Sequence, residues 1–175
     1  MSIAKVPENI SKIDRDDLLV SFMDTTPSGT ANTWAVIGVG IAEYGIAYNP
    51  QIDTEKWIIE KNARSDHSSN QKQADATQKC YKGDPVFEFV AKGRDVLNYT
   101  TNILDVDPWD QGTGTNVGKY PAKMQKAMIT INNWGGENGE CEYSLYYQGD
   151  PTIGYVTIAN GVPTFTEGAI EPANQ

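Results

Sequence analysis

Apolar and polar side chains alternate most regularly in the C-terminal half of the chain. Residues 122–133 and 141–148 place apolar side chains at every second position: Ala127, Ile129 and Ile131 in the first segment, and Cys141, Tyr143, Leu145 and Tyr147 in the second. Because successive side chains of a strand point to opposite faces, this period predicts two strands, each with one buried face. The linking sequence Gly135-Gly136-Glu137-Asn138-Gly139 contains an Asn-Gly pair, which readily takes the positive φ angles of a tight turn. The pattern therefore predicts an antiparallel hairpin.

Shorter strands are predicted on either side of this hairpin. Residues 33–39 form a mostly apolar run with β-branched side chains, which is typical of a strand buried on both faces. Turn-forming residues at 25–29 and 149–152, and the pair Asn160-Gly161, separate the other segments. Further strands are expected at residues 18–23, 43–49, 54–61, 153–158 and 162–166, and residues 99–106 alternate more loosely.

One helix is predicted, over residues 84–97. Asp84 has the side chain of a helix N-cap, and Pro85 follows at the first helical position, where its missing N–H is not needed. Apolar residues then recur at helical spacing and form one stripe: Val86, Phe89, Val90 and Leu97.

Three segments are polar and have too few apolar residues for a core of their own: an N-terminal arm at residues 1–16, a segment at 62–79 and a C-terminal tail at 167–175. A polar segment as long as 62–79 cannot bury itself, so we expect either a mobile loop or an arm that becomes ordered against another subunit. The residues predicted to make such contacts are Asn62, Arg64, Asp66, His67, Asn70, Lys72, Asp75 and Lys79.

Length, composition and charge exclude several classes of protein. A chain of 175 residues suits a single domain, here expected at 17–166, and 39% apolar with 21% charged residues is a globular composition. No apolar run approaches the roughly 20 residues that a membrane span needs, so no membrane partner is expected. The net charge of −9 argues against ordinary nucleic-acid binding, which needs Lys and Arg to replace the counterions of phosphates. Cys80 and Cys141 lack metal-binding spacing and are expected as reduced thiols.

Candidate catalytic, metal and cofactor motifs all fail on inspection. His67 is the single histidine, so a histidine-pair metal site is impossible. The acidic cluster of Asp105, Asp107 and Asp110 lacks the glycine and glutamate of a calcium-binding EF-hand loop. Residues 112–119 miss both the Walker and the dinucleotide-binding glycine patterns. We therefore expect no enzyme, no cofactor and no metal.

Three segments together resemble the tail tube proteins of long-tailed phages. Residues 46–60 are similar to the family's two strands joined by an Asn-Pro turn, here Asn49-Pro50. Residues 81–90 resemble its aromatic-x-Gly-Asp-Pro entry into a helix. Residues 126–156 resemble its C-terminal strands, with Gly149-Asp150 preceding Gly154-x-Val156. With the strands between them, these segments span about two thirds of the chain in the family's order, and the loop at 105–118 departs most from it.

This resemblance implies a mainly β fold, an antiparallel β-sandwich or partial barrel with one flanking helix. It also implies a structural subunit that forms hexameric rings, which stack into a tube through which DNA leaves the capsid. The implied partners are other copies of the chain and other tail proteins (tape measure, terminator, baseplate or sheath), and the implied location is the virion tail, assembled in the host cytoplasm. An acidic lumen would repel phosphates and leave DNA free to move in transit.

Two other classes of function remain open at this stage. A monomeric β-sandwich could bind a carbohydrate or a protein through the aromatic side chains on its strands. A hydrolase that uses its carboxylates is the weakest of the three hypotheses.

Overall fold

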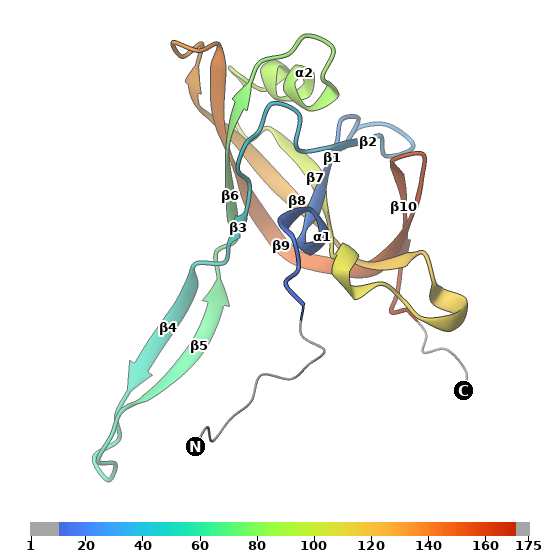
Figure 1. The fold of residues 1–175 in the computed structure, drawn as a ribbon. Helices are drawn as coiled ribbons and strands as arrows, with labels where there is room; N and C mark the ends of the chain where they lie inside the picture. Colours follow the sequence, from blue (N-terminus) through green and yellow to red (C-terminus); the bar gives the residue numbers. More distant parts are fainter. Residues whose placement is uncertain (1–10, 171–175) are drawn as a thin grey trace, which may run out of the picture.

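The computed structural model describes residues 11–170, which form a mainly antiparallel β structure with few helices (Figure 1). The elements, in chain order, are α1 (Arg15–Leu18), β1 (Val20–Asp24), β2 (Trp34–Val36), β3 (Ile46–Ala47), β4 (Pro50–Glu55), β5 (Arg64–Asn70), β6 (Gln73–Lys79), α2 (Pro85–Lys92), β7 (Thr100–Val106), η1 (Pro108–Asp110), η2 (Gly114–Asn116), β8 (Lys119–Trp134), β9 (Glu140–Ala159) and β10 (Val162–Glu167).

One eight-stranded sheet forms the body of the molecule, and it is not closed into a barrel. Its strand order is β2-β1-β7-β8-β9-β6-β3, and β10 pairs with the second half of β9. β4 and β5 form a separate two-stranded ribbon that projects from this body (Figure 1). The predicted antiparallel β fold with a flanking helix is therefore confirmed, in the form of a single open sheet.

The long hairpin of β8 and β9 is the central element of the sheet. Its turn lies where the sequence predicts it, and Gly135 and Gly139 have φ angles of 77° and 70°. The predicted turn at residues 149–152 is wrong, because β9 continues through it. The register with β8 shifts there between Met124 and Lys126, and Gly149 takes a φ of 69°. The turn-forming residues therefore make a bulge within a strand rather than a chain reversal.

Neighbouring residues of the same strand serve two separate cores. Met23 and Ile103 belong to the cluster beneath α2, which also contains Val86, Phe89 and Tyr143. Their chain neighbours Phe22 and Leu104 belong to a second cluster on the opposite face, with Val106, Ala122 and Val156. The sheet thus buries both faces, as the alternation of a strand requires.

Helix α2 begins as predicted, since the Asp84 carboxylate accepts hydrogen bonds from the backbone N–H groups of Val86 and Phe87. It ends earlier than predicted, at Lys92. Gly93 caps it there, and Leu97 is almost fully exposed instead of extending the apolar stripe.

Three further predictions need correction. The strand expected at 33–39 is only Trp34–Val36 and is partly exposed, and the one expected at 43–49 is only Ile46–Ala47. The strand expected at 54–61 lies earlier, at Pro50–Glu55. Trp57 to Glu60 instead form a turn, closed by the Glu60 N–H, which donates to the Trp57 carbonyl at 3.0 Å.

The predicted polar arm at 62–79 is in fact two strands with different environments. β5 belongs to the projecting ribbon, whereas β6 lies inside the main sheet with Ala74, Ala76 and Gln78 buried. The buried face consists of two alanines and a glutamine, so the segment is polar overall although one face is buried.

The predicted terminal arms lie partly outside the described residues. Residues 1–10 of the N-terminal arm and 171–175 of the C-terminal tail are not described, and residues 15–18 form the short α1. Glu167, Gly168 and Ala169 are exposed.

Candidate assembly interface

The β4–β5 ribbon is an exposed hairpin without a hydrophobic core. Every residue of both strands is exposed, and the strands pair from Pro50 opposite Asn70 to Glu55 opposite Arg64. An isolated two-stranded hairpin is marginally stable in water. This hairpin therefore has the structure expected of an element that is completed by contact with another surface.

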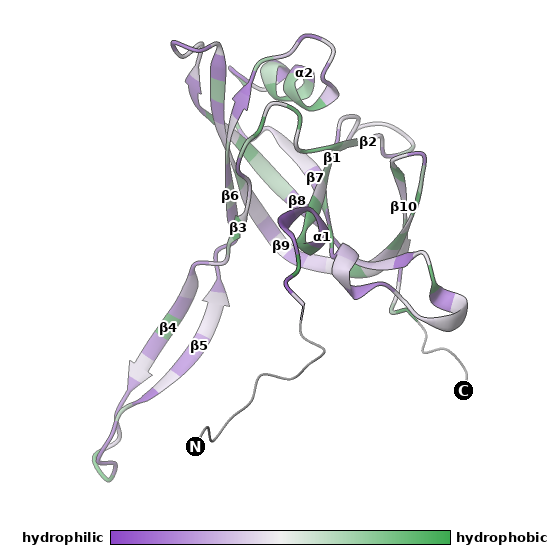
Figure 2. Ribbon diagram, viewed as in Figure 1, coloured by the Kyte–Doolittle hydropathy of each residue, from purple (hydrophilic) through white to green (hydrophobic). Residues whose placement is uncertain are grey.

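Exposed apolar side chains gather at the hairpin tip, defined here as residues 56–63. Ile58 is fully exposed, Ile59 is 89% exposed and Trp57 is 48% exposed. Figure 2 shows hydrophobic colour at this end of an otherwise hydrophilic ribbon. The Arg64 guanidinium lies over the Trp57 ring, 4.8 Å from its centre. Adjacent apolar residues exposed in this way are typical of a contact site.

The hairpin is a direct continuation of two strands of the main sheet. β3 pairs with β6 through Ile46 opposite Ala74, and the same two chain segments continue outward as β4 and β5. Between the two pairings, Asn49 has a positive φ of 43° and its side-chain amide donates to the Gln71 carbonyl at 3.1 Å. The hairpin therefore has a defined junction with the sheet.

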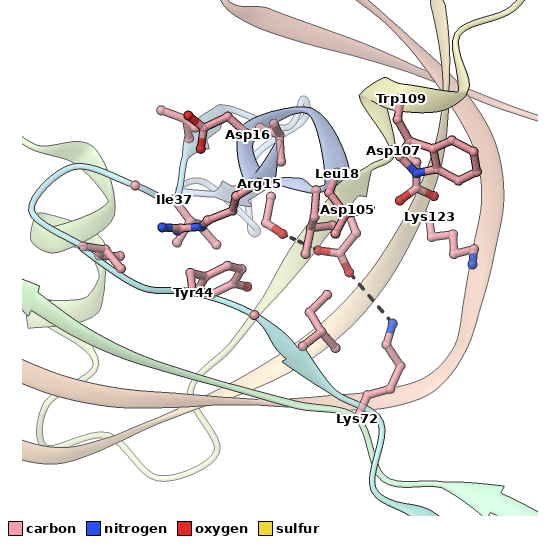
Figure 3. Close-up of a pocket in the computed structure, with 18 of the residues that line it drawn as sticks. Arg15, Asp16, Leu18, Ile37, Tyr44, Lys72, Asp105, Asp107, Trp109 and Lys123 are labelled. Atoms are coloured by element: carbon pink, nitrogen blue, oxygen red, sulfur yellow. Dashed lines mark hydrogen bonds and ion pairs between the residues drawn. The ribbon is translucent and has the colours of Figure 1, made fainter. Parts of the chain in front are cut away.

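Lys72 attaches this junction to the body. Its ammonium group donates to the Gln125 side-chain oxygen at 3.0 Å and lies 3.9 Å from a carboxylate oxygen of Asp105. The same group lies 4.3 Å from the ring centre of Tyr147 and 5.4 Å from that of Tyr48. Figure 3 shows the Lys72 side chain reaching toward Asp105.

Asp105 is a buried residue of β7 and does not belong to a surface loop. Its carboxylate accepts hydrogen bonds from the hydroxyls of Ser21, at 2.6 Å, and Tyr147, at 3.2 Å. Burial raises its pKa above the ordinary value, and this effect outweighs the opposing effects of the Ser21 hydrogen bond and the Lys72 charge. Burial likewise lowers the pKa of Lys72.

A cavity of about 670 Å³, here called the α1 cavity, opens beside this ion pair (Figure 3). Its wall combines apolar and charged side chains. The apolar ones include Leu18, Leu19, Val36, Ile37, Ile41 and Ile46, and the charged ones include Arg15, Asp16, Lys72, Asp105, Asp107 and Lys123. Arg15 holds α1 against the facing loop, because its guanidinium donates to the Ala42 carbonyl at 2.7 Å.

The predicted contact residues fall in four places. Asn62 lies in the hairpin tip, Arg64, Asp66, His67 and Asn70 lie on β5, and Lys72 lies at the junction. Asp75 and Lys79 lie on β6, so they are part of the main sheet and not of the hairpin. The His67 ring nitrogen is 2.8 Å from the Asn70 side-chain oxygen on the exposed ribbon.

The motifs set aside in the sequence take up ordinary structural positions. Among the described residues, no group of three His, Cys, Asp or Glu side chains comes together as a metal site. Residues 112–119 contain the short 3-10 helix η2 and lead into β8, so no α-helix follows the glycines. Both cysteines are free thiols, as predicted. No helix in the described part of the chain has the length and apolar character to cross a membrane.

Two features of this site were missed by sequence reasoning. The Trp57-Ile58-Ile59 run was assigned to a strand, although an apolar run flanked by Lys and Glu also fits an exposed turn. The Lys72–Asp105 contact joins residues far apart in the chain, so no local sequence pattern predicts it.

Comparison with known proteins gives a match among solved structures only. No family model matches the sequence, and no curated protein matches it. Among solved structures, the chain is similar to one described as the tail of an empty GTA particle, computed with helical refinement and C6 symmetry. The TM-score is 0.55 at 18% sequence identity, and the match covers 80% of this chain and 97% of the other. At this identity the likeness establishes a shared fold.

Proposed function

We propose that this protein is the structural subunit of a phage or phage-like tail tube, which forms hexameric rings that stack and conduct DNA. The observation that carries the proposal is the fold shared with the tail of a C6-symmetric GTA particle, over nearly the whole of that chain. The sequence resemblance to tail tube proteins, stated above from separate motifs, supports the same role.

The exposed hairpin supports self-assembly in particular. Its strands have no core and its tip carries unprotected apolar side chains, so contact with another subunit would remove apolar surface from water. We assign the assembly arm to residues 50–70, which replaces the segment 62–79 expected from the sequence. Other tail proteins would meet the ends of the tube through the same surfaces.

The charge of the chain fits passage of DNA without binding. A net charge of −9 gives a repulsive field toward phosphates, so a tube of such subunits would not retain the polyanion that it carries.

The test replaces residues 51–69 with a short glycine linker between Pro50 and Asn70, which lie opposite each other in the ribbon. We expect a folded, soluble protein that no longer forms tubes, because the sheet and both cores stay intact. Circular dichroism checks folding, and electron microscopy with sedimentation checks assembly. Deleting 62–79 instead would remove β6 and its buried Ala74 and Ala76, and serves as the unfolding control.

Tubes formed by the hairpin-deleted protein would contradict the assembly role of the hairpin. A wild-type protein that stays monomeric at every concentration, and that saturably binds a glycan, would favour the monomeric binding module over the tube.

A further inference from the structure

The α1 cavity has the shape and lining of a site for apolar side chains. Leu18 and Val36, at its mouth, are 51% and 45% exposed, although Ile37 and Ile41 behind them are buried. Its volume of about 670 Å³ lies within the range of sites that hold ligands.

The hairpin of the same molecule does not fill this cavity. The ribbon leaves the body at residues 48 and 72 and extends outward, so that its tip lies at the far end of the projection (Figure 1). A tip that entered the cavity would therefore have to come from another molecule.

The charges beside the two surfaces are opposite. The α1 segment Asp14-Arg15-Asp16-Asp17, at the cavity, carries three carboxylates and one guanidinium, all exposed. Residues 56–64, around the tip, carry Lys56, Lys61 and Arg64 against one acidic residue, Glu60. The side chains that line the cavity itself are balanced, with three cations and three carboxylates. The carboxylate excess therefore lies on the α1 segment beside the cavity, where a net positive tip would bring opposite charges together.

We propose that the α1 cavity receives the hairpin tip of a second copy of this chain, with Trp57, Ile58 and Ile59 packing against the apolar side chains that line it. The proposal rests on the tube function and names the surface that the hairpin contacts. Lys72 and Tyr48 line the cavity and also sit at the base of the hairpin. A tip docked in the cavity of one subunit therefore touches the residues that orient the hairpin of that same subunit. Docking of one tip would thus help to position the hairpin that docks into the next subunit.

Cross-linking tests this pairing directly. In a Cys80→Ser background, which leaves only the buried Cys141, Ile58→Cys is combined with Val36→Cys and assembly is followed by mild oxidation. We expect a ladder of covalent dimers, trimers and higher species on a denaturing gel. Ile58→Cys combined with Val162→Cys, a residue of similar exposure on β10, should give none.

A charge at the cavity mouth gives a second readout. Leu18→Asp is expected to raise the protein concentration needed for tube formation at least tenfold without changing the circular dichroism spectrum, because Leu18 is half exposed. Val117→Asp, at an exposed site outside the cavity, should assemble as the wild type does.

The outcomes of these experiments test the docking site and the tube function separately. Tubes without the Ile58–Val36 cross-link, or normal assembly of Leu18→Asp, would overturn the docking site and leave the tube function standing. A cross-link that forms only after removal of residues 1–10 would assign the cavity to that segment instead. A wild-type protein and an oxidised double variant that both remain monomeric would overturn both.

Discussion

The ammonium nitrogen of Lys72 lies 3.9 Å from a carboxylate oxygen of Asp105, and both side chains are nearly buried, at 11% and 8% exposure. This contact joins the base of the projecting hairpin to a central strand of the sheet. Burial shifts both pKa values toward the neutral forms, and each charge opposes that shift in the other.

Removing the cation should therefore destabilise the protein. Lys72→Met leaves Asp105 buried without its counter-charge, and we expect a loss of about 2–3 kcal/mol in the free energy of unfolding, measured by urea denaturation. Lys123→Met is the matched control, because Lys123 is opposite Asp105 in β8 but exposed, and it should change stability by less than about 0.5 kcal/mol. Equal losses in the two variants would contradict the role given to Lys72.

The two aspartates Asp105 and Asp75 should respond to pH in opposite directions. Because burial holds the folded pKa of Asp105 above its usual 3.8, its contribution is fully present below that value and is lost as pH rises through the folded pKa. Hydrogen bonds from Ser144 and Gln73 lower the pKa of Asp75, so its contribution is present above 3.8 and is lost as pH falls through the folded pKa.

Unfolding measured from pH 3 to 7 checks both signs. The stability of Asp105→Asn relative to the wild type should rise with pH, and that of Asp75→Asn should fall. Parallel pH profiles for the two variants would show that the environment of Asp105 is wrongly described.

The two thiols should differ in reactivity. Burial, with the nearby Cys80 as a second cause, raises the pKa of the Cys141 thiol to about 12, so almost no reactive thiolate exists at pH 8. A thiol-specific reagent should modify Cys80, which is only partly buried, and should reach Cys141 only when urea unfolds the protein. Rapid labelling of both thiols in the folded protein, with Cys80→Ser as the control, would contradict this.

Gly154 is needed for the close approach of β10 to β9. A Cβ at this position would overlap the Thr166 carbonyl and the Phe165 ring, so Gly154→Ala should cost about 1–3 kcal/mol in thermal or urea unfolding. Gly38→Ala is the control, because nothing lies within 4 Å of its added Cβ and stability should hardly change. A neutral Gly154→Ala would mean that β10 packs less tightly on β9.

Local chemistry was enough to predict the parts of the fold that depend on neighbouring residues. The turns at 135–139 and 160–161 and the Asp84 cap were correct, because Asn-Gly and Asp-Pro pairs act within a few residues. The continuity of β9 through Gly149 was not predictable in this way, since its pairing with the distant β8 overrides the turn preference.

The candidate site was predictable only in outline. Polar composition correctly indicated that residues 62–70 could not bury themselves. It did not separate them from β6, whose buried positions hold only two alanines and a glutamine. The tip was missed because apolar side chains in a sequence are normally interpreted as buried, whereas those of the tip are exposed.

The shared strands of hairpin and sheet also determine how the molecule carries mechanical load. Because β5 leads into β6, and β6 pairs with β9 along its full length, tension applied along the arm acts on that whole row of backbone hydrogen bonds together. Such a row resists shear far better than bonds that open one after another. In a tube linked through these arms, a pull would pass along continuous backbone within each subunit, from arm to sheet, and between subunits through the docked tip.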